Sequence, residues 1–166
     1  MKRLIVDSDD NLVGSKTREE LDLVKDIYRV SGLWITNSHG QALLAQRGLD
    51  NDDGAGEWGP AVAGTVQEGE TYETNIYKEA EEEIGLKGAA FSLGPKQRIS
   101  GTRNYFCQWF TTAVDKEVSS FTLQATEVAA LQWVDETNLL QDIEANPGKY
   151  VPGMATAVKL LVSQLR

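Results

Sequence analysis

The stretch from residue 64 to residue 86 reads GTVQEGETYETNIYKEAEEEIGL. From Thr71 its composition predicts a helix, because the run through Ile84 contains neither Gly nor Pro and Gly85 is a typical residue at which a helix stops. An apolar residue recurs at every fourth position of this stretch, and the resulting stripe would anchor the helix in a core. The stripe consists of Tyr72, Ile76, Ala80 and Ile84.

Three carboxylates gather on one side of the same predicted helix. Glu79, Glu82 and Glu83 stand at i, i+3 and i+4, which are neighbouring positions on a helix surface. Like charges at these spacings cost roughly a few tenths of a kcal/mol per pair, so a bound cation is the natural compensation. Oxygen ligands with no nearby His or Cys favour a hard cation, Mg²⁺ or Mn²⁺, whose shell is completed by waters and substrate phosphates. The sequence predicts a metal site on this helix.

The simpler alternative is a solvated, Glu-rich face of a surface helix, which is the usual meaning of such sequences. Six positions at fixed spacing argue against it. At about 7% per position, a chance match in a chain of this length has a probability on the order of one in a hundred thousand. The six positions are Gly64, Glu70, Glu79, Glu82, Glu83 and Gly85.

In this spacing the stretch resembles the signature of the Nudix hydrolases, which reads Gly, five residues, Glu, seven residues, then Arg-Glu-hydrophobic-x-Glu-Glu-x-Gly-hydrophobic. Every position is met except the arginine, which is Lys78 here. Ala80 and Leu86 fill the two hydrophobic places. A looser similarity continues at residues 43–47, 58–60 and 127–134.

The resemblance implies a role for each matched residue. Glu79 and Glu83 are expected to ligate the divalent cation, with Glu82 as a further ligand or acting through water. Gly64 is expected to contact the metal through its carbonyl group, and Glu70 to orient the catalytic set that these glutamates form. The implied fold is α/β, a Nudix-like α/β/α sandwich with a mixed sheet. The implied activity is hydrolysis of a phosphoanhydride bond in a nucleoside diphosphate linked to another moiety, or in a similar small diphosphate.

Two other functions stay open. The N-terminal third resembles the branch of the superfamily that contains isopentenyl diphosphate isomerase. That isomerase needs a cysteine just before the first glycine of the box and a histidine just after it, where this chain has Ala63 and Thr65. Cys107 and His39 are the only cysteine and histidine, so isomerase chemistry is disfavoured. The other alternative is a non-catalytic nucleotide-binding Nudix module, which has no need of a complete set of metal-binding glutamates.

Phosphate contacts and the general base are expected from other parts of the chain. Arg47, Arg98 and Arg103 are the basic residues best placed in sequence to bind substrate phosphates, against the alternative of ordinary surface salt bridges. Attack of water on phosphorus needs neutralised oxygens and an oriented nucleophile, both of which carboxylate-held Mg²⁺ supplies. Related enzymes take their base from the box or from a later loop, where Glu127 is the candidate. The sequence leaves the base open.

Length and composition predict a single domain over residues 1–166, because no linker or compositional break divides the chain. One cysteine cannot form an internal disulfide, and the sequence has neither a signal peptide nor a run of membrane-spanning length, so we expect a cytoplasmic protein with no membrane partner. The net charge of −9 argues against a nucleic-acid polymer as partner. A small diphosphate substrate is compatible with it, because Mg²⁺ and local basic groups dominate at contact distance. A homodimer is left open.

Strands interleaved with two main helices predict an α/β sandwich with a mixed sheet. A turn-rich break at residues 37–40 separates two strands, so His39 is expected on an exposed turn. The loop at residues 48–59 precedes the box and is expected to border the site. The expected strands are residues 27–36, 42–47, 103–114 and 130–134, and the second helix is residues 154–165.

Overall fold

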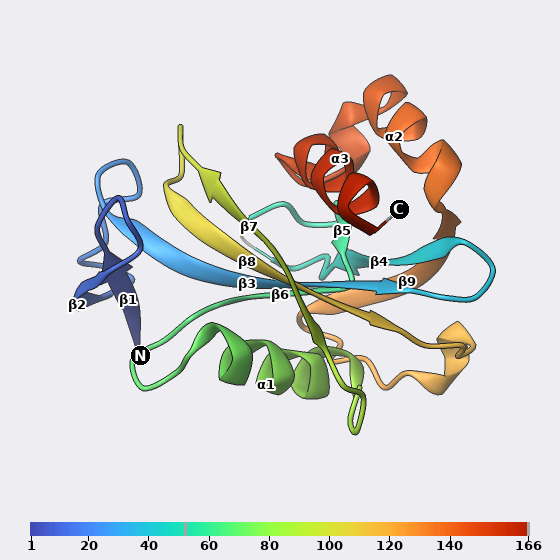
Figure 1. Ribbon diagram of the computed structural model, residues 1–166, viewed down its shortest axis with the longest axis horizontal. Helices are drawn as coiled ribbons and strands as arrows, with labels where there is room; N and C mark the ends of the chain where they lie inside the picture. Colours follow the sequence, from blue (N-terminus) through green and yellow to red (C-terminus); the bar gives the residue numbers. More distant parts are fainter. Residues whose placement is uncertain (52, 166) are drawn as a thin grey trace.

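A mixed sheet runs through the middle of the fold (Figure 1). In the computed structural model, which describes residues 1–51 and 53–165, this sheet has nine strands. They are β1 (Lys2–Val6), β2 (Leu12–Thr17), β3 (Ile27–Thr36), β4 (Gln41–Arg47), β5 (Trp58–Pro60), β6 (Val62–Thr65), β7 (Ser92–Ile99), β8 (Tyr105–Ala113) and β9 (Val128–Asp135). The helices of the same residues are α1 (Tyr72–Ile84), α2 (Glu136–Ala145), α3 (Met154–Leu165) and the short 3-10 helices η1 (Val118–Ser120) and η2 (Pro147–Lys149).

The sheet is built on β3. This strand pairs in parallel with β8 from Tyr28 to Thr36, and antiparallel with β1 and β6. Within the described residues, β4 pairs with β3 only at Thr36↔Ala42 and otherwise pairs with β5 and β9. The sheet therefore divides into two halves beyond the β3–β4 hairpin, with β6 on one half and β5 on the other.

Helices cover both faces of the sheet, with α1 on one face and α2 and α3 on the other (Figure 1). Alternation along β3 supplies both cores, because Leu33 and Ile35 pack in the cluster that contains α1 while Trp34 packs in the cluster that contains α2 and α3. The predicted α/β/α sandwich with a mixed sheet is confirmed. None of the helices in the described ranges is long and apolar enough to cross a membrane.

The helix α1 begins and ends where its sequence predicts. Thr71 caps the N-terminus through a reciprocal pair of hydrogen bonds: its Oγ1 accepts from the backbone N–H of Thr74 at 3.1 Å, and Thr74 Oγ1 accepts from the N–H of Thr71 at 2.8 Å. Such a cap stabilises a helix by about 1 kcal/mol. Gly85 ends the helix in the left-handed region, with φ of 68°. Ile76 and Ile84 are fully buried, as the apolar stripe predicts.

Several elements go beyond the sequence predictions. Two main helices were expected, and the structure adds α2, which starts after Asp135, a residue whose carboxylate accepts a hydrogen bond from the N–H of Thr137 at 3.0 Å. Five strands were not predicted: β1, β2, β5, β6 and β7. β8 begins at Tyr105 instead of residue 103, and β9 begins at Val128 instead of residue 130. The other expected strands are present, and His39 lies exposed in the β3–β4 turn as predicted.

Candidate active site

Glu79 lies directly against Gly64, so the helix α1 and the strand β6 meet at this point. A Cβ atom added to Gly64 would stand 2.7 Å from the Cδ of Glu79 and 3.0 Å from its Oε1. Those separations are closer than non-bonded atoms tolerate, so position 64 must be glycine for the Glu79 carboxylate to occupy this place. The glycine of the box is therefore required by a close approach.

Glu79 and Glu83 lie one helical turn apart, close enough for the charge of Glu79 to raise the pKa of Glu83. Burial raises the pKa of Glu83 to about 9, reinforced by the negative charges of Glu79 and Glu127 and opposed by Arg47. Burial likewise raises the pKa of Glu79, while the positive charge of Lys78 opposes the rise. Two carboxyl groups this close to each other are both ionised only when a positive charge lies close to both.

Glu70 and Lys78 brace this pair. Glu70 Oε2 accepts hydrogen bonds from the N–H of Gln67 at 3.0 Å and from Nδ2 of Asn75 at 2.9 Å. Lys78 Nζ forms an ion pair with Glu70 and reaches Oε1 of Glu79 at 3.6 Å. Burial would raise the pKa of Glu70, but the hydrogen bonds from Lys78, Gln67 and Asn75 outweigh it and the pKa is lowered. Lys78 therefore lies between an ionised Glu70 and the Glu79 carboxylate, where it can orient both.

The donor set fits a hard divalent cation. The carboxylates of Glu79 and Glu83 and the backbone of Gly64 offer oxygen atoms only. Across residues 1–51 and 53–165, no three side chains of His, Cys, Asp or Glu are already grouped at metal-ligand spacing. Mg²⁺ is typically held by one or two carboxylates, with water and substrate phosphates filling the remaining positions. The Glu79 and Glu83 pair would hold such a cation, with the carbonyl of Gly64 as the candidate backbone ligand.

Arg47 and Glu127 are brought to the carboxylates from the other half of the sheet. β4 and β9 pair so that Arg47 lies opposite Val128, and the N–H of Gly48 donates to the carbonyl of Glu127 at 2.9 Å. Both side chains act on Glu83, since Arg47 lowers its pKa and Glu127 raises it. The predicted phosphate ligand Arg47 and the predicted base Glu127 thus lie near the carboxylate pair, at the division between the two halves of the sheet.

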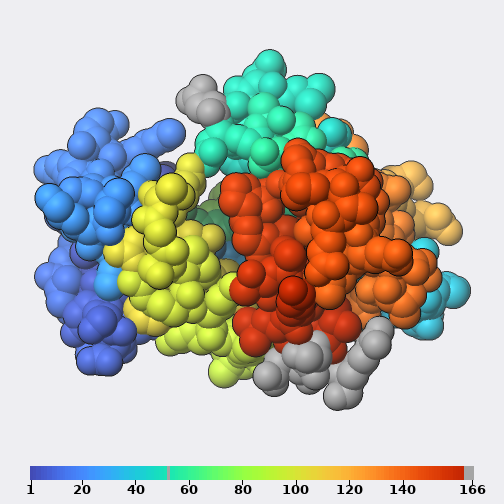
Figure 2. All heavy atoms as spheres, turned by 90° about the horizontal axis from the view of Figure 1, so that it is seen from above, coloured from blue at the N-terminus to red at the C-terminus, as the bar shows by residue number. Residues whose placement is uncertain are grey.

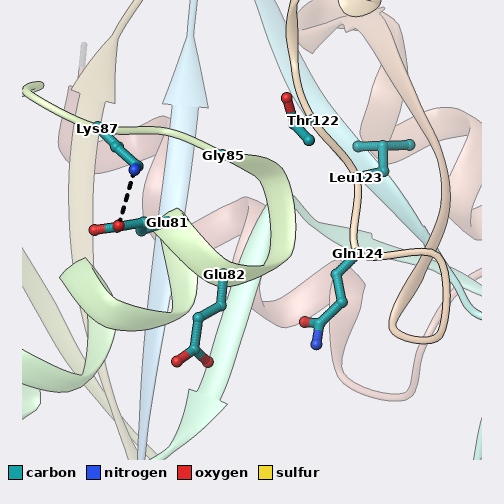
Figure 3. Close-up of a pocket in the computed structure, with 7 residues that line it drawn as sticks. All are labelled: Glu81, Glu82, Gly85, Lys87, Thr122, Leu123 and Gln124. Atoms are coloured by element: carbon teal, nitrogen blue, oxygen red, sulfur yellow. Dashed lines mark ion pairs between the residues drawn. The ribbon is translucent and has the colours of Figure 1, made fainter.

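Glu82 has a different environment from its two neighbours. Its side chain is exposed and lines an open groove with Gln124, whereas Glu81 on the far side of the groove pairs with Lys87 at 3.1 Å (Figure 3). The segment beside the groove caps the end of α1, because the N–H of Gln124 donates to the carbonyl of Glu83 at 2.9 Å. Glu82 is therefore open to solvent at the groove.

The structure does not bring Arg98 or Arg103 to the carboxylates. Arg98 lies over the ring of Phe106 at 5.1 Å, and its Nη1 donates to the carbonyl of Tyr105 at 3.3 Å. Phe106 pairs with Arg29, whose guanidinium lies over Tyr72, so Arg98 lies toward the first turn of α1, whereas Glu79 and Glu83 are in its later turns. Arg103 follows β7 and forms an ion pair with Asp53 in the segment before the box.

Two features of the site were missed by the sequence reasoning. Asn75 is fully buried, and its Nδ2 also donates to the carbonyl of Thr65 at 3.1 Å, which joins the end of β6 to α1. A polar residue beside an apolar stripe was the available signal. The second feature is a hollow on the face that carries α3, bordered by the segment of residues 48–58 in teal and the β7–β8 connection in yellow (Figure 2). No local pattern marks such a hollow.

Comparison with known proteins identifies relatives of this chain. The chain is 29% identical over 154 residues to the prenyl-diphosphate phosphatase of Methanosarcina mazei, which covers 92% of this chain and 90% of that protein. It is 30% identical over 130 residues to the isopentenyl-diphosphate Delta-isomerase of Enterobacter sp. (strain 638), which covers 74% of this chain and 69% of that protein.

A solved structure and a family model cover most of the chain. The DR0079 protein of Deinococcus radiodurans superposes over 100% of both chains with a TM-score of 0.84 and 22% sequence identity, which shows a shared fold. The NUDIX domain model matches residues 27–154, a range that contains the whole stretch from Gly64 to Leu86. On this match, the chain belongs to the NUDIX domain family.

Proposed function

We propose that this protein is a hydrolase that cleaves a phosphoanhydride bond in a nucleoside diphosphate linked to another group, or in a similar small diphosphate, with Mg²⁺ or Mn²⁺ as its cofactor. The observation that carries the proposal is the pair of Glu79 and Glu83 one turn apart on α1, with Glu79 held against Gly64 and paired with Lys78. A pair that cannot ionise fully by itself is completed by a divalent cation and the phosphates it binds.

In this proposal each residue has a separate task. Glu79 and Glu83 hold the cation, which when bound neutralises phosphate oxygens and orients the attacking water. Lys78 and Glu70 keep Glu79 in place, and Arg47 offers positive charge to a phosphate at the division of the sheet. The proton of the water passes to a nearby carboxylate.

The accepting carboxylate belongs either to the box or to the later loop. Glu82 is exposed and free to turn toward a bound water, and Glu127 is exposed beside Glu83. A box base predicts that Glu127→Gln keeps most of the turnover, and a loop base predicts that it loses most of it. The pH profiles of kcat for the single variants Glu82→Gln and Glu127→Gln separate these cases.

The isomerase alternative finds no support in the local chemistry. Ala63 offers only a methyl group where proton exchange with carbon is needed, and Thr65 is no histidine. Cys107 cannot substitute, because it is buried in the core below α3 and its burial raises the pKa of the thiol. A prenyl diphosphate remains a sensible test substrate, since the M. mazei relative is named a prenyl-diphosphate phosphatase.

The test is a hydrolysis screen with metal-free protein, restored with Mg²⁺, Mn²⁺ or neither. Nucleoside diphosphate sugars, dinucleotides, geranyl diphosphate and isopentenyl diphosphate are scored by phosphorus NMR for phosphate, pyrophosphate or nucleoside monophosphate. We expect metal-dependent cleavage that Glu83→Gln lowers at least about a hundredfold. Glu81→Gln is the matched control, since Glu81 is exposed on the same helix and pairs with Lys87. Undiminished turnover in EDTA, or in Glu83→Gln, would contradict the proposal.

A further inference from the structure

Asn75 is a fully buried polar residue on the buried side of α1. Both N–H groups of its amide are used: Nδ2 donates to the carbonyl of Thr65 at 3.1 Å and to Oε2 of Glu70 at 2.9 Å. Its Oδ1 is buried as well, but it accepts no hydrogen bond from any group in residues 1–51 and 53–165. A buried acceptor without a donor destabilises a fold, so stability alone favours an apolar side chain at this position.

The two partners fix the orientation of the amide. The Thr65 carbonyl and the Glu70 carboxylate only accept hydrogen bonds, so the NH₂ end of the amide must face them. The reversed amide would direct Oδ1 at two further acceptors and lose both hydrogen bonds. The unpartnered oxygen is therefore the consequence of using both N–H groups to hold the segment between β6 and α1.

The first hydrogen bond sets α1 against β6 beside the candidate cation site. Thr65 follows Gly64, the glycine against which Glu79 packs. Asn75 and Glu79 stand at i and i+4 of α1, so they are neighbours on one side of the helix. The two contacts of α1 with β6, one at Thr65 and one at Gly64, are thus adjacent along both elements. Asn75 holds the helix at the separation from the strand that the Glu79 side chain needs.

The second hydrogen bond reaches Glu79 by another route. Oε2 of Glu70 accepts from Asn75 and from the N–H of Gln67 at 3.0 Å. Oε1 of Glu70 pairs with Lys78, which in turn reaches Oε1 of Glu79 at 3.6 Å. Without the Asn75 amide, Oε2 keeps the N–H of Gln67 as its one donor within the described ranges, and the carboxylate is free to turn. Its rotation would draw Lys78 away from Glu79.

We propose that Asn75 is a positioning residue of the cation site. Its hydrogen bond to Thr65 fixes the strand against which Glu79 packs, and its hydrogen bond to Glu70 fixes the ion pair beside Glu79. The inference rests on the proposed function and deepens it, because it concerns how tightly Glu79 and Glu83 hold the divalent cation. Removing a group that orients metal ligands typically lowers metal affinity about 10- to 100-fold.

Ser31 provides the matched control. It is also polar and fully buried, and its Oγ donates to the carbonyl of Tyr72 at 2.8 Å, which ties β3 to the first turn of α1. This hydrogen bond ends in the first turn, whereas those of Asn75 reach Thr65 and Glu70. Ser31→Ala therefore removes a buried hydrogen bond between sheet and helix and leaves both hydrogen bonds of Asn75 in place.

Mn²⁺ binding to metal-free protein tests the inference without turnover. Calorimetry compares the unmodified chain with Asn75→Ala, Glu70→Gln, the double variant and Ser31→Ala, and thermal melting in the absence of metal reports the fold. We expect Asn75→Ala to weaken Mn²⁺ binding at least about tenfold in Kd. The double variant should lose much less than the product of the two single losses, because Asn75 acts partly through Glu70. Ser31→Ala should leave Kd within about twofold, whatever its effect on melting.

Asn75→Leu keeps the test open if Asn75→Ala unfolds, because leucine fills a similar volume and removes the unpartnered oxygen. Its melting temperature should stay within about 4 °C of the unmodified protein, while its Mn²⁺ affinity falls as in Asn75→Ala. Unchanged Mn²⁺ affinity in the Asn75 variants, or single losses that multiply in the double variant, overturns the inference. No Mn²⁺ binding by the unmodified protein contradicts the proposed function and this inference with it, whereas Mn²⁺ binding that is insensitive to Asn75 contradicts only the positioning role.

Discussion

Replacing Gly64 with Ala is expected to remove most of the activity while the protein stays folded. The new Cβ would stand 2.7 Å from the Cδ of Glu79, whereas non-bonded carbon atoms prefer about 3.5–4.0 Å. The Glu79 carboxylate must therefore move by about 1 Å. A displacement of about 1 Å in a catalytic arrangement can lower turnover about a hundredfold, and we expect a loss of that order in kcat.

The fold should tolerate this change. Position 64 lies in a strand, and replacing glycine there reduces the freedom of the unfolded chain, so the free energy of unfolding should change by less than about 1 kcal/mol. Gly14→Ala is the control, because Gly14 is also in a strand and an added Cβ would meet no heavy atom within 4 Å. The assay combines metal-dependent kcat with thermal melting. Full activity in Gly64→Ala would refute the argument from close approach. An equal loss of activity in Gly14→Ala would show that the effect is not specific to position 64.

Three further predictions concern Lys78, Asp10 of the N-terminal hairpin, and isomerase activity. Lys78→Arg should keep activity within about tenfold, since a guanidinium can join two carboxylates, whereas Lys78→Ala should weaken Mn²⁺ binding more than it lowers the melting temperature. Asp10→Asn should lower stability at neutral pH, because the effect of burial on the pKa of Asp10 is outweighed by hydrogen bonds from Lys96 and Arg29, which lower that pKa below its ordinary value. The stability advantage of the unmodified protein is therefore present above the ordinary pKa and is lost as the pH falls through the lowered pKa, which measurements of unfolding across acid pH check. Isopentenyl diphosphate in deuterated water should take up no label, because Ala63 cannot exchange a proton with carbon; metal-dependent labelling of the product would overturn the hydrolase proposal.

Local signals predicted α1 well because each of its determinants lies within the helix or next to it. Thr71 caps it, Gly85 ends it, and Ile76 and Ile84 are buried as their spacing predicts. The strand β3 was equally predictable, since its apolar run serves two cores at once.

The remaining features depend on pairing that no local pattern marks. β1 pairs with β2 and β3, and β7 pairs with β8, while the bridge between Arg3 and Gln67 joins segments far apart in the chain. The same reason explains the arginines. Arg47 and Arg98 look alike in sequence, but the register of β4 with β9 takes Arg47 to Glu83, while Arg98 lies over Phe106, its partner on β8.

The most direct test of the central claim is a titration of metal-free protein with Mn²⁺, followed by calorimetry in the unmodified chain, Glu83→Gln and Glu81→Gln. The account predicts one site that Glu83→Gln weakens at least about tenfold in Kd, because one of the two joined carboxylates is lost. It predicts no change for Glu81→Gln, whose carboxylate is exposed and paired with Lys87. Equal Mn²⁺ affinity in all three proteins would contradict a metal site at Glu79 and Glu83.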